Sequence, residues 1–138
     1  MVVVYIDMVA DMFHMGHVNI LKKAKELGST LIVGIHSDST VELNKRKPIM
    51  SMTERIAVME SCRYVDRVVP DAPLRITPEY LQMLGADLVV HGDDISESDK
   101  EHFYGLVMDR YREFKYTEGV STSDIIRRVK EYGVVIKK

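Results

Sequence analysis

The stretch that decides the fold is residues 2–37, which contains "VVVYID" (2–7), "HVNILKKAKELG" (17–28) and "TLIVGIHS" (30–37). The first and third segments are short, almost continuously apolar and rich in β-branched residues, as is typical of strands buried on both faces of a sheet. The middle segment repeats apolar residues at helical spacing and meets a helix stop at Gly28. A strand, a helix and a second strand in this order predict the βαβ unit of a parallel sheet.

The same alternation continues along the rest of the chain. Ser51 and Glu54 form the pattern of a capping box, and Thr77 before Pro78 is a second helix start. Repeated βα units predict an α/β fold with a Rossmann-like, doubly wound parallel sheet, and we expect residues 1–138 to form a single domain. The predicted helices are 51–63, 77–86, 98–111 and 121–133, and the predicted strands are 65–69, 87–92 and 112–116.

Composition and charge narrow the class of protein. Hydrophobic residues make up 46% of the chain and charged residues 29%, which are ordinary values for a globular domain. The formal net charge of −2 argues against a nucleic-acid partner, which favours a basic surface. The single Cys62 has no partner for an internal disulfide, and neither a membrane-spanning run nor a targeting leader is found. We therefore expect a cytoplasmic protein without a membrane partner.

Polar and charged side chains follow the ends of the predicted strands. In doubly wound sheets, ligands bind beyond the carboxyl ends of the strands, so these residues are expected to meet in one site. The positions are Asp11, His14, Gly16 and His17 after the first strand, His36, Ser37, Asp38 and the basic run 44–47 after the second, 91–94 after the fourth, and 116–123 after the fifth.

The motif "HMGH" (14–17) stands where the first strand meets its helix. Free N–H groups and the helix dipole favour an anion there, and Gly16 allows a phosphate to approach the backbone. Two imidazoles add N–H donors that stabilise the charge developing on phosphorus oxygens in a transition state. A zinc site is the alternative, but one Cys and scattered His supply too few ligands. The position of the motif favours phosphoryl or nucleotidyl transfer.

A second helix start presents Gly119 followed by Ser121, Thr122 and Ser123. Hydroxyl and N–H groups at a helix N-terminus suit a polyphosphate, although for this element alone ordinary N-capping is the better explanation. Two such helix starts in one α/β domain favour a nucleotide. The run 45–47, Lys-Arg-Lys, is expected on a loop that overhangs the same edge and clamps phosphates, or else on a solvated surface.

Arg55 and Arg63 are eight positions apart on one predicted helix and share roughly one face. That spacing suits the capture of an acceptor anion or a subunit contact, and the alternative is a surface stripe of ion pairs with Glu54 and Glu60.

Four segments together resemble the cytidylyltransferase branch of the HxGH nucleotidyltransferases. They are "HMGH", "HGDD" (91–94), "YTEGVSTS" (116–123), which is similar to R-T-E-G-I-S-T-[ST] after its first residue, and "TERIAVMESCRYVDRVV" (53–69). The resemblance implies a Rossmann-like fold, a homodimer, and transfer of CMP from CTP to a phosphorus oxyanion with release of pyrophosphate and with Mg²⁺ as cofactor.

The resemblance also implies roles for particular residues. His14, His17, Lys45 and Thr122 are the expected catalytic residues, and Arg55 and Arg63 are expected to face the acceptor anion or the dimer interface. Asp94 and Asp11 are the expected metal ligands. The expected nucleotide-binding residues are Asp11, Gly16, Asp38, Arg46, His91, Gly92, Asp94, Tyr116, Glu118, Gly119, Ser121 and Thr122.

Two departures from the family pattern bear on the acceptor. Met8 and Ala10 stand in the segment that is often G-x-F-D in the family, and Tyr116 replaces the usual Arg. A Tyr at this place resembles the phosphonate cytidylyltransferases, so we expect a small phosphonate or phosphate monoester as acceptor. Glycerol-phosphate, ethanolamine-phosphate and choline-phosphate enzymes, an adenylyltransferase, and a non-catalytic nucleotide sensor are the alternatives. The candidates for contact with the acceptor tail are His36, Arg75, His91 and Tyr104.

Overall fold

The computed structural model describes residues 1–115 and 120–133, and within them five parallel strands form one sheet. The order of the strands is β3-β2-β1-β4-β5, with β1 in the centre. The chain builds outward from β1 to β2 and β3, and then returns to the other side of β1 with β4 and β5. The switch point therefore lies between β1 and β4. The strands are β1 Val3–Met8, β2 Thr30–Ile35, β3 Arg67–Val69, β4 Leu88–Gly92 and β5 Tyr111–Phe114.

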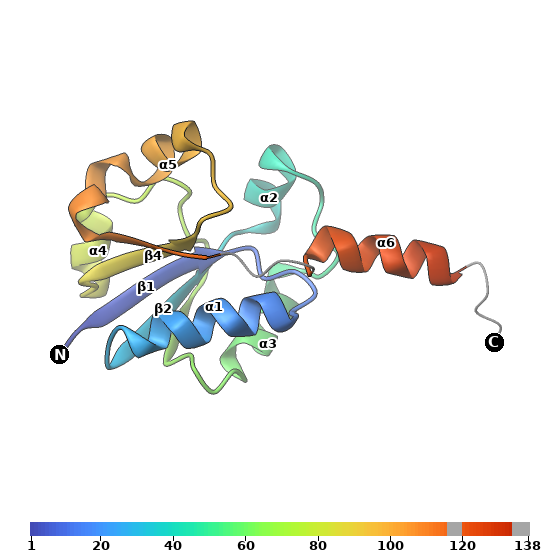
Figure 1. Ribbon diagram of the computed structural model, residues 1–138, viewed down its shortest axis with the longest axis horizontal. Coiled ribbons are helices and arrows are strands. Elements are labelled where there is room, and N and C mark those ends of the chain that lie inside the picture. Colours follow the sequence, from blue (N-terminus) through green and yellow to red (C-terminus); the bar gives the residue numbers. More distant parts are fainter. Residues whose placement is uncertain (116–119, 134–138) are drawn as a thin grey trace.

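Helices cover both faces of this sheet (Figure 1). On one face lie α1 (Met15–Glu26) and α3 (Met52–Glu60), and on the other lie α4 (Pro78–Leu84) and α5 (Glu97–Tyr104), which continues into the 3₁₀ helix η1 (Gly105–Arg110). Two further helices, α2 (Asp38–Asn44) and α6 (Thr122–Gly133), begin beyond the carboxyl ends of strands. The predicted Rossmann-like, doubly wound α/β fold is confirmed.

The alternation of side chains along β1 divides the core into two parts. Val4 and Ile6 pack with α1 and α3, whereas Tyr5 packs with α4 and η1. Because side chains alternate along a strand, Asp7 lies on the same face as Tyr5. Its carboxylate accepts a 2.6 Å hydrogen bond from the Tyr104 hydroxyl. Asp7 thus brings a charge to the end of an otherwise apolar strand.

The predicted helix starts are confirmed at two places. Ser51 and Glu54 form the expected capping box at the start of α3. Thr77 caps α4, where Pro78 occupies the first turn, and Gly85 ends this helix in the left-handed conformation at φ 71°. These caps satisfy backbone groups that have no partner within the helix.

The structure corrects three predicted elements. A short helix, α2, occupies 38–44, where we expected only loop, because Ser37 caps it and Val41 is buried against the body. The predicted helix 98–111 divides into α5 and η1, and Val107 leaves helical geometry at φ −128°. The helix predicted over 51–63 ends at Glu60, so Arg63 lies beyond it and does not share a helix face with Arg55.

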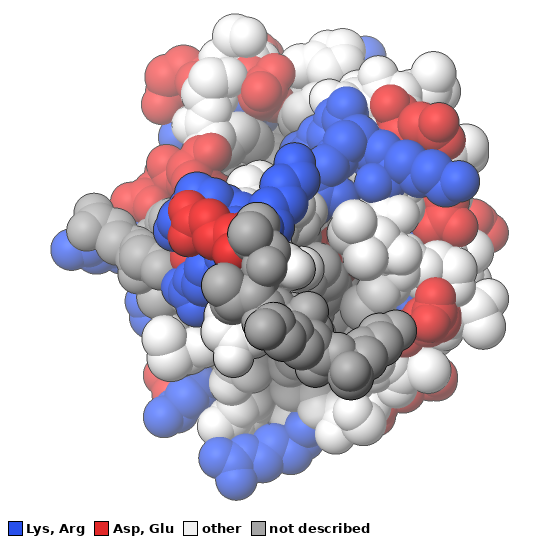
Figure 2. Space-filling model, turned by 90° about the vertical axis from the view of Figure 1, so that its right-hand side faces the viewer, with Lys and Arg blue, Asp and Glu red and all other residues white. Residues whose placement is uncertain are grey.

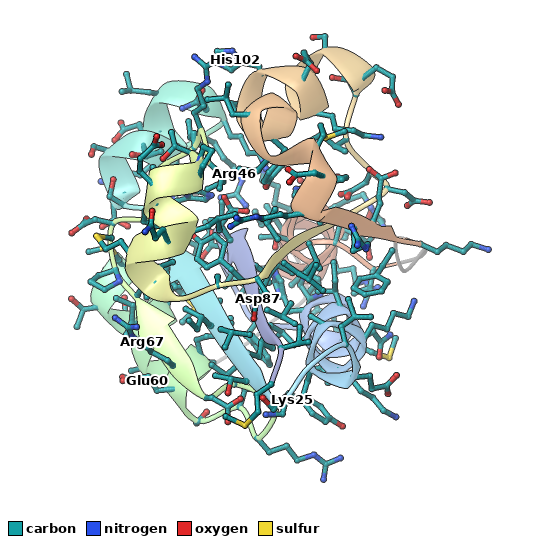
Figure 3. All side chains as sticks on the ribbon, turned by 90° about the vertical axis from the view of Figure 1, so that its left-hand side faces the viewer. Lys25, Arg46, Glu60, Arg67, Asp87 and His102 are labelled. Atoms are coloured by element: carbon teal, nitrogen blue, oxygen red, sulfur yellow. The ribbon has the colours of Figure 1, made fainter. Side chains whose placement is uncertain are left out.

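The amino ends and the carboxyl ends of the strands differ in what surrounds them. At the amino edge, seen in Figure 3, Asp87 accepts a bond from the Val3 backbone, and Asp66 accepts bonds from the Leu31 backbone and from Lys25. These carboxylates accept hydrogen bonds from backbone N–H groups at the starts of β1 and β2. The opposite edge is open, and the residues singled out in the sequence lie there.

Candidate active site

A cavity of about 670 Å³ opens at the carboxyl edge of the sheet, where the β1 and β4 ends meet α2 and α6. Figure 2 looks onto this edge, across which Lys and Arg side chains gather in a band. The cavity lies at the topological switch point, where ligands bind in folds of this kind. Eight of the predicted site residues line it: Gly16, His17, Lys45, His91, Gly92, Asp94, Ser121 and Thr122.

His14 and His17 form a capping box at the start of α1. The Nδ1 atom of His14 accepts the Gly16 backbone N–H at 3.1 Å, and the Nδ1 atom of His17 accepts the His14 backbone N–H at 3.0 Å. Because a backbone N–H can only donate, both Nδ1 atoms are acceptors, and each neutral ring carries its proton on Nε2. The helix start thereby fixes two imidazoles as Nε2–H donors.

Burial keeps both imidazoles neutral. It lowers the pKa of His14, and together with the neighbouring His14 it lowers the pKa of His17 to about 4. The two rings lie 3.9 Å apart between centroids, and Phe13 stacks on His17. A neutral ring that presents one N–H stabilises developing negative charge on an oxygen without itself titrating near neutral pH.

Gly16 is required by the geometry of this turn. A β-carbon at position 16 would lie 2.9 Å from the His14 ring, which is closer than real contacts allow. On the other side of His14, the Thr122 hydroxyl lies 3.4 Å from Nε2 and donates to the Asp11 carbonyl at 2.9 Å. The two helix starts singled out in the sequence therefore meet, with Thr122 between His14 and the cavity.

The Asp11 carboxylate is hydrogen-bonded to loop 46–50. It accepts the backbone N–H groups of Ile49 and Met50 at 2.8 and 2.9 Å, and Arg46 at 3.1 Å. Burial raises the pKa of this carboxyl, but the two backbone bonds and Arg46 outweigh it, so the pKa is lowered. The side chain does not line the cavity, which contrasts with the nucleotide or metal contact that we expected from it.

Arg55 is fully buried and bonds to three other segments of the chain. Its guanidinium donates to the backbone carbonyls of Val9, His36 and Met50 and forms a 2.5 Å ion pair with Asp38. With these partners it does not reach the cavity, contrary to the expectation that it faces an acceptor anion. Asp38, which we expected to bind the nucleotide, is instead the partner of Arg55 in this ion pair.

Lys45 and Arg46 separate at the end of α2. Lys45 is exposed and lines the cavity, whereas Arg46 pairs with Asp11 and borders a smaller adjoining cavity. Among the three basic residues of this run, Lys45 is therefore the one placed to contact a phosphate in the main cavity.

Asp94 follows β4 and presents a half-exposed carboxylate to the cavity, 4.0 Å from the His91 ring. No cluster of three or more His, Cys, Asp or Glu side chains that suits a metal occurs in residues 1–115 and 120–133. Mg²⁺ is commonly held by one or two carboxylates together with substrate phosphates, and Asp94 suits that mode. Asp11, whose carboxylate is already bonded, does not.

Further polar side chains that the predicted site did not include also line the cavity. Asp7, His36 and Tyr104 lie at its floor, and His36 and Tyr104 were among the candidates for the acceptor tail. Asp7 was missed, although a charged residue at the end of the run "VVVYID" is a signal for a functional side chain. Lys115, which directly follows β5, also lines the cavity and was missed.

Some predicted residues lie elsewhere. Arg63 is exposed and bonds to the Tyr64 hydroxyl, and Arg75 is exposed outside the cavity, so neither contributes to this site. Tyr116, Glu118 and Gly119 lie outside the described residues. Within the described part of the chain we find no helix of the length and hydropathy that a membrane span requires.

A parallel α/β domain with neutral imidazoles, helix N-termini and hydroxyls at its switch point has the character of a nucleotidyltransferase domain. The family model "Cytidylyltransferase-like" matches residues 8–128, and the chain belongs to this family.

Several curated relatives bear the names of cytidylyltransferases. The probable ethanolamine-phosphate cytidylyltransferase of Schizosaccharomyces pombe is 43% identical over 91% of the chain and 35% of its own length. The ethanolamine-phosphate cytidylyltransferase of Dictyostelium discoideum is 40% identical over 91% and 36% of the two chains. Choline-phosphate cytidylyltransferase A of Homo sapiens is 40% identical over 98% and 38%. The chain thus spans little more than a third of the length of these relatives.

A solved structure shares the fold. The lipopolysaccharide core biosynthesis protein from Thermoplasma volcanium superimposes with a TM-score of 0.68 at 24% identity, over 85% of this chain and 97% of its own. At this identity the likeness bears on the fold alone.

Proposed function

We propose that this domain transfers CMP from CTP to a small phosphate monoester that carries an amino group, with release of pyrophosphate. The observation that carries the proposal is the meeting of the His14–His17 capping box with Thr122 at the mouth of one cavity. The names of the ethanolamine-phosphate and choline-phosphate relatives support CTP as donor and an amino-alcohol phosphate as acceptor.

The reaction forms one P–O bond and breaks another. An oxygen of the acceptor phosphate attacks the α-phosphorus of CTP, and the bond from that phosphorus to the bridging oxygen of pyrophosphate breaks. Negative charge builds on the α-phosphate oxygens, and the Nε2–H of His17 is positioned in the cavity to donate to one of them. Because no covalent enzyme intermediate is required, positioning and electrostatic stabilisation suffice.

The remaining phosphates lie between basic and hydroxyl groups in this proposal. In the free protein the His14 Nε2–H points to the Thr122 hydroxyl, which donates to the Asp11 carbonyl, and a phosphate oxygen bound there would accept a hydrogen bond from His14. Ser121 and the N-terminus of α6 complete that side, and Lys45 closes the other. Asp94 would hold Mg²⁺, which supplies neutralisation of phosphate charge when bound.

Turnover of CTP with ethanolamine phosphate tests the proposal, with pyrophosphate release as the measurement. We expect His17→Ala to lower kcat by about 100-fold or more while the affinity for CTP falls less. His102→Ala is the matched control, because His102 is exposed on α5 outside the cavity, and its activity should equal that of the parent. A sensor would lose binding alone, and turnover with ATP but not CTP would identify an adenylyltransferase.

A phosphonate remains the second candidate for the acceptor, and Ala10 is the observation that favours it. Ala10 lines the cavity with a small side chain at the place where the family often has Phe. The comparison of ethanolamine phosphate with 2-aminoethylphosphonate isolates this question, because the two share the amine and differ in the ester oxygen. A higher kcat/KM for the phosphonate would assign it as the acceptor.

We also propose a homodimer, as the resemblance implies. The mass of the purified protein in solution, measured by light scattering, tests this part independently of activity.

A further inference from the structure

The smaller cavity beside the main one is an extension of it. Its volume is about 220 Å³, several times the ~30 Å³ that one water molecule takes in the liquid, so it has room for a small anion. Val9, Val41, Lys45 and Ser123 line both cavities, whereas Arg46 lines the smaller one and not the main one. The two cavities therefore meet between the end of α2 and the start of α6, and Arg46 lies beyond that junction.

Arg46 is anchored to the protein through its Nη1 atom. This atom donates to the Asp11 carboxylate at 3.1 Å and to the Lys47 backbone carbonyl at 3.2 Å. The Asp11 side chain is only 2% exposed, and the backbone N–H groups of Ile49 and Met50 also donate to it. The anchor is therefore fixed, and the guanidinium is oriented before any ligand binds.

The other edge of the Arg46 guanidinium keeps its donors. An Arg side chain carries five N–H groups, and the Nε–H and one Nη2 N–H form a parallel pair that matches two oxygens of a phosphate. Within residues 1–115 and 120–133 we find no hydrogen bond from Arg46 Nε or Nη2. The side chain is 40% exposed and lines the smaller cavity, so a ligand there has access to these donors.

The surroundings of these donors suit an anion with several oxygens. Lys45 brings a second positive charge, and Ser123 brings a hydroxyl from the first turn of α6. Among the described residues, no carboxylate lines the smaller cavity. Because the main cavity is where the nucleotide reacts in the proposed function, an anionic group beyond Lys45 is the far end of the phosphate chain.

We propose that the terminal phosphate of the donor nucleotide binds in the smaller cavity, and that Arg46 is the residue that selects a nucleoside triphosphate over a diphosphate. This inference rests on the proposed function and names the part of the donor that the adjoining cavity takes. The Nε–H and Nη2 N–H groups of Arg46 donate to two oxygens of that phosphate. Asp11 is a positioning residue that holds the guanidinium in the required orientation.

The selectivity comes from a contact that a diphosphate does not reach. With its nucleoside in the main cavity, CDP places its two phosphates beside His17 and Thr122 and ends before the junction. The parallel donors of Arg46 then stay in contact with water and contribute nothing to binding. A lysine at the same position would supply a point charge without the second parallel donor.

Calorimetric titration with CTP and with CDP, in the absence of an acceptor, measures this selectivity. We expect Arg46→Gln to lower the affinity for CTP by about 10- to 100-fold and that for CDP by about 3-fold or less. Arg46→Lys keeps a charge that can pair with Asp11, but a single ammonium does not also supply the parallel donors, so the preference for CTP should fall as well. Equal losses of affinity for both nucleotides would mean that Arg46 only holds the loop, and would overturn the inference.

Lys47→Gln is the matched control, because Lys47 follows Arg46 on the same loop, is exposed, and lines neither cavity. It removes the same charge and keeps the backbone carbonyl that accepts from Arg46. Both affinities should equal those of the parent. A parent that binds CTP and CDP equally, or an Arg46 variant with the CTP-to-CDP ratio of the parent, would overturn the inference.

Measuring binding without turnover separates this inference from the proposed function. Absence of turnover with every acceptor would refute the proposed transfer, while the CTP-to-CDP ratio would still decide the role of Arg46. Turnover together with an unaltered ratio in Arg46→Gln would leave the transfer standing and refute the terminal-phosphate site. No binding of either nucleotide by the parent would refute both.

Discussion

Asp7 and Asp11 flank the same short turn and are almost equally buried, yet their carboxylates have opposite surroundings. Asp11 accepts two backbone N–H groups and the Arg46 guanidinium, and it lies outside the cavity. Asp7 accepts one hydroxyl, lies 3.6 Å from the His36 Nε2 atom, and lines the cavity. One carboxylate is enclosed by the protein, and the other faces the cavity.

The difference separates a structural role from a binding role. A buried carboxylate that has all its donors stabilises the segments that supply them, because the bonds to a charged group exceed the cost of burying it. A buried carboxylate that lines a cavity is open to a ligand, and its charge attracts a positively charged group. Substitutions at the two positions should therefore have opposite consequences.

The largest expected effect on stability is that of Arg55, which bonds to backbone segments near both carboxylates. Arg55 holds the Val9 carbonyl, between the two Asp residues, and the His36 carbonyl beside Asp7. We expect Arg55→Met to lower the free energy of unfolding by about 4 kcal/mol, because it leaves buried carbonyls without donors. Urea unfolding measures this change. Arg63→Met is the control and should leave stability unchanged, since Arg63 is exposed; equal effects of the two would refute the role of Arg55.

The next effect belongs to Asp7. In Asp7→Asn the amide oxygen still accepts from Tyr104, but the charge that Asp7 presents to the cavity is lost. We expect kcat/KM for ethanolamine phosphate to fall by about 100-fold, or ~2.7 kcal/mol, with KM for CTP unchanged. A variant that loses stability and keeps its activity would reverse the comparison with Asp11.

The sequence predicted most of the fold because its signals are local. The strand-helix-strand pattern of 2–37 and the caps at Ser51 and Thr77 depend on neighbours along the chain, and the structure confirms them. The short helix α2 escaped prediction because seven residues give little periodicity. The end of α3 before Arg63 escaped it because no Gly or Pro follows Glu60 directly.

The site was predicted where position along a strand determines function, and not where long-range contacts do. His17, Lys45 and Thr122 line the cavity or its edge because their elements end at the carboxyl edge. Nothing in the spacing of Arg55 reveals that its side chain is fully buried, or that loop 46–50 donates to Asp11. Such contacts join residues distant along the chain, and their donors and acceptors are decided only by the folded backbone.

Asp11→Asn should act on stability, in contrast to Asp7→Asn. The amide presents an N–H₂ group to the backbone N–H donors of Ile49 and Met50, so we expect a loss of about 2 kcal/mol in the free energy of unfolding. The folded pKa of Asp11 lies below its unfolded value, so its contribution is present above about pH 3.8 and is lost as the pH falls through the folded pKa.

Urea unfolding at pH 7 and pH 3 measures both effects. The variant should differ from the parent at pH 7 and approach it at the lower pH. Asp109→Asn is the control at an exposed position and should match the parent at both values. Unchanged stability of Asp11→Asn at pH 7 would mean that the carboxylate does not hold the loop.

The smallest expected effect on stability is that of His17. Unlike the two carboxylates, this buried side chain is neutral in the folded protein. Its pKa is about 4 in the folded protein and 6.5 in the unfolded chain, so the unfolded chain binds a proton first as the pH falls. Stability should fall by about 0.7 kcal/mol between pH 7 and pH 6 on account of His17. Proton NMR of the ring should give a titration midpoint near pH 4. A midpoint near 6.5 would show that the ring becomes charged in the working range, and His17 would then act on phosphate as a cation and not as a neutral donor.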